Sequence, residues 1–149
     1  MSEIKKSSSI EQQEAGHIIF NMVKDWLGVD LKEPYKIYLA DTYMEPDFFS
    51  EKEPIVGEIF SHIGKPKKAQ DNKIANDILK MLLLDKLHNK IYRKIIVVCD
   101  DAEYKKLNGK SLVAESIRQF NIEIKKFDLS DDVRNRIIEA QNRQVMVNK

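Results

Sequence analysis

Residues 44–60, MEPDFFSEKEPIVGEIF, combine a Pro-Asp pair, a short polar break and an apolar run that one glutamate interrupts. The break, SEKEP, has the composition of a turn, and the segments on either side of it are typical of short strands. Because the connection is short, we expect these strands to pair as an antiparallel hairpin. Such a hairpin would bring the carboxylates of Asp47 and Glu58 together at one edge of a sheet.

Glu58 is the single charged residue in a strand whose other residues suggest burial. Strand alternation places it on the same face as Val56 and Phe60. A charge in such a place is costly unless it is paired or binds a metal. Magnesium takes oxygen ligands, commonly one or two carboxylates, so Asp47, Glu58 and the backbone carbonyl of Ile59 would suffice. The alternative is that Glu58 pairs with a lysine at the end of a sheet.

The rest of the chain predicts an alternation of helices and strands. Helices placed between strands require crossover connections, so the later strands should run parallel in one sheet. We therefore expect an α/β fold with helices on both faces of a mixed sheet. The expected elements are a helix from about Ser9 to Gly28, strands over 35–40, 42–49 and 54–60, a helix over 67–87, a strand over 94–99, a helix over 111–120, a strand over 122–129 and a helix from residue 130 or 131.

Bulk properties fit one ordinary globular domain. The 149 residues are 42% apolar and 33% charged, a soluble balance, and no segment has the apolar length of a membrane span. We expect a flexible tail over residues 1–9, without the apolar segment of a signal peptide, and a single domain over residues 10–149. The lone cysteine, Cys99, excludes an internal disulfide and fits a cytoplasmic protein in which it is an inert core thiol.

The order helix, hairpin with Pro-Asp, strand with Glu58 and long helix resembles the core of the PD-(D/E)XK nuclease superfamily, over residues 11–99. The resemblance implies a restriction-endonuclease-like three-layer α/β/α sandwich. It also implies that Asp47 and Glu58 bind Mg²⁺ or Mn²⁺ for hydrolysis of a phosphodiester bond in DNA. A glutamate of the first helix often joins that metal site, and Glu14 and Glu11 are the candidates here.

The chain departs from the family pattern where the motif has a lysine, because Phe60 stands there. The missing part is a cation that orients water and stabilises developing charge near the scissile phosphate. Lys73, on the following helix, is the first candidate to supply it. Lys65 is the second, and His62 is a further rival. Alternatively, Lys73 is a solvated partner of Asp77 one helical turn later.

A basic cluster follows the motif strand, although the net charge of the chain is only +1. We expect its residues to contact a nucleic-acid backbone without reading sequence: Lys65, Lys67, Lys68, Gln70 and Lys73. A homodimer would suit a duplex, since two-fold symmetry matches two strands. The alternative function is a catalytically inactive nuclease-like domain that binds nucleic acid or assembles with proteins, which Phe60 favours. A third possibility is an unrelated α/β protein that acts only through protein contacts.

Overall fold

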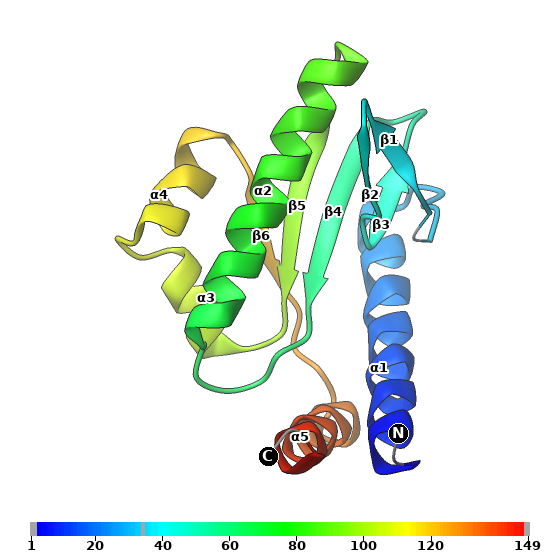
Figure 1. The fold of residues 1–149 in the computed structure, drawn as a ribbon, viewed down its shortest axis with the longest axis vertical. Helices are drawn as coiled ribbons and strands as arrows, with labels where there is room; N and C mark the ends of the chain where they lie inside the picture. The colour runs from blue at the N-terminus through cyan, green and yellow to red at the C-terminus, as the bar shows by residue number, and fades with distance from the viewer. Residues whose placement is uncertain (1–2, 34, 148–149) are drawn as a thin grey trace.

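The computed structural model describes residues 3–33 and 35–147, with side chains described over 13–33 and 35–146. These residues form a mixed α/β architecture (Figure 1). Its elements, in chain order, are α1 (Glu3–Leu27), β1 (Ile37–Leu39), β2 (Thr42–Met44), β3 (Phe48–Ser50), β4 (Ile55–Phe60), α2 (Lys68–His88), β5 (Arg93–Val98), α3 (Asp101–Leu107), α4 (Leu112–Gln119), β6 (Glu123–Lys126) and α5 (Asp131–Val147).

The main sheet is four-stranded and mixed, in the order β3-β4-β5-β6. The short turn after β3 makes β3 and β4 an antiparallel pair, with Phe48 opposite Gly57, as the sequence predicts. The crossover through α2 makes β5 parallel to β4, and β6 is parallel to β5. β1 and β2 form a separate two-stranded antiparallel sheet.

Strand alternation divides the core between the two faces of the main sheet. On one face, Ile95 and Val97 of β5 pack with apolar residues of α1 and α5. On the other face, Ile96 and Val98 pack with apolar residues of α2, α3 and α4. Figure 1 shows α2 in front of the sheet, roughly along the direction of its strands, and α1 crossing α5 near the carboxyl ends of β4 and β5. The helices therefore cover both faces of the sheet.

Gly57 is required by the close approach of the Phe48 ring across the β3–β4 pair. A Cβ atom at residue 57 would lie 1.9 Å from the nearest ring carbon of Phe48, far inside van der Waals contact. The ring is fully buried in the core on the α1 side. Gly57 thus lets an aromatic ring lie flat against β4 immediately before Glu58.

The structure corrects three expectations about the elements. Residues 42–49 are not one strand, because Pro46 has no N–H to donate and divides them into β2, which pairs with β1, and β3, which pairs with β4. The segment after β5, expected as a loop, contains α3, which the Asp100 side chain caps at the Ala102 N–H (3.0 Å). α1 begins at Glu3, so residues 3–9 of the expected tail are helical. Good helix formers flank the serines there, and a helix stabilised by tertiary packing extends readily beyond its packed part.

Among the described helices, none combines the length and the apolar character that a bilayer crossing requires.

Candidate functional site

Asp47 and Glu58 meet at the edge of the main sheet. Because Phe48 lies opposite Gly57 in an antiparallel pair, the residue before Phe48 lies beside the residue after Gly57. The Asp47 Oδ2 atom accepts a hydrogen bond from the Ile59 N–H at 2.7 Å, and the Asp47 and Glu58 carboxyl groups are hydrogen-bonded to each other. The hairpin thus joins two acids that lie eleven residues apart in the sequence.

The Glu58 carboxyl is held in its protonated form. Glu58 is 6% exposed and lies on the face of β4 that α2 covers. Burial, and then the negative charges of Asp47 and Asp77, raise the pKa of Glu58 to about 10, while the Lys73 ammonium opposes the shift. Near neutral pH, Glu58 is therefore protonated and donates a hydrogen bond to the Asp47 carboxylate.

A third acid, Asp77, approaches this pair from α2. It is 5% exposed, and burial raises its pKa against the opposing charges of Lys73 and Lys80. The lysine nitrogens lie 3.8 Å from Asp77 Oδ2 and 3.7 Å from Oδ1, respectively. Oδ2 is buried without a hydrogen-bond partner. Asp77 thus attracts two ammonium groups, and that of Lys73 is close enough to Glu58 to act on its pKa.

Lys73 places its ammonium group over Phe60. The Nζ atom lies 4.5 Å from the centre of the Phe60 ring, within the range of a cation–π contact. The Phe60 ring is buried against Ile74 and Ile78, whereas the Lys73 side chain is 59% exposed. A solvent-accessible cation therefore stands directly above an aromatic residue of β4, two positions after Glu58.

The carbonyl of Ile59 lies on the same edge as Asp47. In a β-strand, the N–H and C=O of one residue point to the same side of the chain, and the Ile59 N–H points to Asp47. β3 begins at Phe48, so this carbonyl extends past the end of the β3–β4 ladder. It can supply a third oxygen beside the two carboxylates.

This donor set suits a hard cation that keeps most of its waters. The described residues hold no group of three or more His, Cys, Asp or Glu side chains arranged to bind a metal. Two carboxylates and a backbone carbonyl are nevertheless a donor set of the size that Mg²⁺ commonly uses, since it retains several water ligands.

A cavity of about 440 Å³ opens beside Asp47 on the α1 side of the sheet. Its lining residues are Gln13, Gly16, His17, Phe20, Glu33, Asp47, Ile59 and Ser61. Glu14 is exposed and lines a different hollow, next to Arg136 of α5, and is not among the residues that line the Asp47 cavity. The side chain of Glu11 lies outside the described part of the structure.

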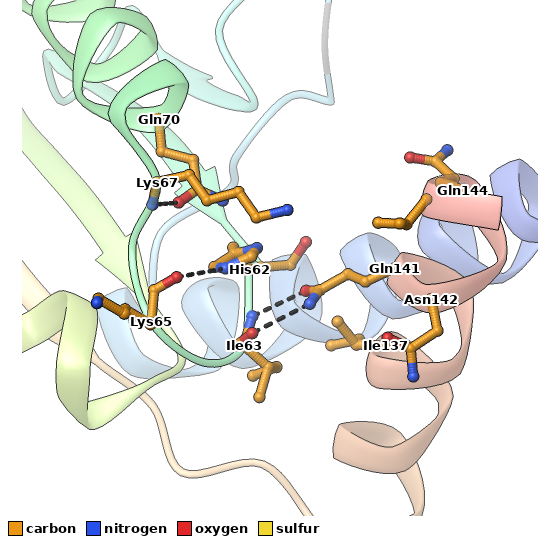
Figure 2. Close-up of a pocket in the computed structure, with 11 residues that line it drawn as sticks. His62, Ile63, Lys65, Lys67, Gln70, Ile137, Gln141, Asn142 and Gln144 are labelled. Atoms are coloured by element: carbon orange, nitrogen blue, oxygen red, sulfur yellow. Dashed lines mark hydrogen bonds between the residues drawn. The ribbon is translucent and has the colours of Figure 1, made fainter. Parts of the chain in front are cut away.

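A second, larger groove lies between the β4–α2 loop and the carboxyl-terminal half of α5 (Figure 2). It measures about 850 Å³. Its lining residues are Ser61, His62, Ile63, Lys65, Lys67, Gln70, Ile137, Gln141, Asn142, Gln144 and Val145. The side chain of Gln141 joins the two walls, since Oε1 accepts from the Ile63 N–H (2.8 Å) and Nε2 donates to the Ile63 carbonyl (3.0 Å).

The groove gathers part of the basic cluster predicted from the sequence. In Figure 2 the amino end of Lys67 extends toward α5, whereas that of Lys65 points away from it. The Oε1 atom of Gln70 accepts from the Lys67 N–H at 2.6 Å and so fixes the start of α2. Lys68 is exposed and lies outside the groove. Lys65 lines this groove rather than the Asp47 cavity, which leaves Lys73 as the lysine beside the acids.

Sequence reasoning paired Asp77 with Lys73 but missed the burial of Asp77 and the contribution of α5. Asp77 falls between Ile74, Ile78 and Met81 at helical spacing, so its place in an apolar stripe was a usable signal of burial. By contrast, the polar residues of α5 meet the β4–α2 loop only through the tertiary fold, and no local pattern marks them. His17 likewise reaches the Asp47 cavity through the packing of α1 on the sheet.

Known protein-family models, curated protein sequences and solved structures yielded no match to this chain.

Proposed function

We propose that this protein is a divalent-cation-dependent hydrolase of nucleic-acid phosphodiester bonds, with a restriction-endonuclease-like fold. The observation that supports this most is the Asp47–Glu58 pair, in which Glu58 is buried with a strongly raised pKa and the ammonium group of Lys73 is near enough to oppose that shift. Buried acids with strongly shifted pKa values concentrate at functional sites, because an uncompensated carboxyl is costly to keep in a core. The antiparallel β3–β4 pair followed by α2 and parallel β5 supports the fold assignment.

Each residue has a distinct role in this proposal. Asp47, Glu58 and the Ile59 carbonyl would hold Mg²⁺ or Mn²⁺, which when bound supplies polarisation of the phosphate. Glu58 releases its proton when it becomes a ligand, since a protonated carboxyl is a poor one. Lys73 stabilises the negative charge that develops on the phosphate and helps to orient the attacking water. Asp77 is a positioning residue that keeps the Lys73 ammonium near the acids.

A second candidate function is a catalytically inactive domain of the same fold that binds nucleic acid. Phe60 at the motif lysine position favours this alternative, and so does the deep burial of Glu58. A homodimer belongs to the hydrolase proposal only for a duplex substrate, because two active sites would serve two strands. One copy of the chain is sufficient for a single strand.

A cleavage assay separates the two candidates. End-labelled DNA and RNA, each as a single strand and as a duplex, are incubated with Mg²⁺, Mn²⁺ or EDTA. The hydrolase proposal requires metal-dependent products that Asp47→Asn and Glu58→Gln abolish. Glu45→Gln, which changes an exposed acid two residues before Asp47, should cleave normally. Binding without products on any substrate would support the inactive module. Cleavage that survives both active-site substitutions would refute the proposed site.

A further inference from the structure

We propose that the groove of Figure 2 binds a single strand of nucleic acid and guides its backbone to Asp47. This inference rests on the hydrolase function proposed above and specifies the form of its substrate. It rests on the charge of the groove, its rigidity, its position beside the Asp47 cavity and its size.

The charge of the groove suits a polyanion. Among the described residues that line it, none is Asp or Glu, although these residues make up 24 of the 149 in the chain. Two lysines, a histidine and several amides provide its polar surface instead. Lysines attract phosphates through charge, and side-chain amides donate to both phosphate oxygens and base edges.

The groove is held in shape before any ligand binds. The backbone N–H and C=O of Ile63 both form hydrogen bonds with the Gln141 side chain, which ties the β4–α2 loop to α5. Within the loop, His62 Nε2 lies 3.2 Å from the Lys65 carbonyl, and Gln70 holds the Lys67 N–H. A preorganised surface loses less conformational entropy on binding than a flexible one.

The groove leads to the proposed active site. Ser61 lines both this groove and the cavity that contains Asp47 and Ile59. Ser61 follows β4 directly, so both hollows border the carboxyl end of that strand. We therefore place the path of a strand bound between Lys67 and α5 past Ser61 toward Asp47.

The size of the groove selects a single strand over a duplex. Its volume of about 850 Å³ lies in the range of pockets that enclose small molecules, enough for a short run of nucleotides with walls on two sides. Unpaired bases also expose their hydrogen-bonding edges to amides such as Asn142. Val145, which is exposed, adds apolar surface against which a base can lie.

The test is fluorescence anisotropy with labelled oligothymidylate and oligouridylate, each also presented as a duplex, in EDTA so that no hydrolysis occurs. Lys67→Glu should weaken single-strand binding about tenfold or more and lower the salt dependence by about one phosphate contact. Lys68→Glu makes the same charge change one residue away, outside the groove, and should have a much smaller effect. On α5, Asn142→Asp should weaken binding, whereas Asn135→Asp, at an exposed residue outside the groove, should not.

The proposal is overturned if duplexes bind as tightly as single strands. It is also overturned if each groove variant matches its control. The DNA and RNA arms identify which strand binds better, and a preference for either is compatible with the groove. Comparing binding with cleavage distinguishes this inference from the hydrolase function. Strand binding without cleavage by any form of the protein would support the groove and refute the hydrolase. Cleavage that Asp47→Asn abolishes but that Lys67→Glu and Asn142→Asp leave unchanged would support the hydrolase and refute the groove.

Discussion

The Nζ atom of Lys73 lies 4.5 Å from the centre of the Phe60 ring, so a lysine of α2 stands over an aromatic residue of β4, two positions after Glu58. The aromatic face and the Asp77 carboxylate together hold an ammonium group that is still open to solvent. The aromatic ring at position 60 therefore does not keep a cation away from Glu58, because Lys73 supplies one from the next helix. Phe60 supports that cation while it fills the core beneath α2.

Lys73→Met is expected to lower the rate of hydrolysis by about a hundredfold or more, the usual loss when one donor to a developing anion is removed. Lys80→Met is the matched control, because Lys80 also lies within 3.8 Å of Asp77 and belongs to the same helix. Both variants remove one ion pair with Asp77, so their thermal stabilities should be similar. Initial rates at saturating metal measure the difference, and equal losses in the two variants would contradict the assignment of Lys73.

Glu58→Gln is expected to stabilise the protein increasingly as the pH rises. The pKa of Glu58 is about 10 in the folded protein and about 4.3 in an unfolded chain. The folded state thus binds the proton more tightly, and this contribution to stability is complete below pH 4 and declines as the pH rises toward 10. The decline is at most about 1.4 kcal/mol per pH unit.

Glutamine keeps a neutral donor toward Asp47 but does not ionise, so the variant should lack this decline. Melting temperatures of both proteins from pH 5 to pH 9, without divalent metal, give the measurement. Parallel curves for the two proteins would show that Glu58 does not titrate with a raised pKa.

Binding of the divalent cation is expected to release about one proton near pH 8, since Glu58 is protonated in the free protein and must ionise to become a ligand. Affinity for Mn²⁺ should consequently rise up to about tenfold per pH unit between pH 6 and pH 9. Calorimetric titration in buffers with different ionisation enthalpies counts the protons. A pH-independent affinity with no proton release would place the cation away from Glu58.

Gly57→Ala is expected to destabilise the fold by about 1–3 kcal/mol, the usual cost of overpacking a core. The new methyl group would meet the Phe48 ring at 1.9 Å, so β3 must shift against β4. Chemical denaturation measures the loss, and Gly16→Ala is a matched control because a Cβ there meets nothing within 4 Å. Adding Phe48→Leu to Gly57→Ala should cost less than the sum of the two single changes. Full additivity would argue against this contact.

Local signals were sufficient to predict most of the fold. The turn SEKEP implied the β3–β4 pair, and the apolar periodicity of residues 67–87 implied α2, which runs from Lys68 to His88. The proximity of Asp47 and Glu58 followed from the same turn, because a short hairpin allows few registers. The split between β2 and β3 was missed, although Pro46 was visible, since the flanking apolar residues read as one continuous strand.

The remaining features depend on tertiary packing. The α5 wall of the groove and the approach of His17 to Asp47 arise from how α1 and α5 cross on one face of the sheet. The raised pKa of Glu58 depends first on burial, then on Asp47 and Asp77. Helical spacing places Asp77 in an apolar stripe but does not show which strand it meets. Long-range relationships of this kind have no signature in a single sequence.

The most direct test of cation binding by Asp47 and Glu58 is a structure from crystals grown with Mn²⁺, with anomalous scattering recorded to locate the ion. We expect an anomalous peak between Asp47 and Glu58, about 2.0–2.3 Å from a carboxylate oxygen of each. We expect this peak to be absent from crystals of Glu58→Gln. A well-ordered Asp47–Glu58 pair with no peak between the two carboxyl groups, at saturating Mn²⁺ and pH 8 or above, would contradict it.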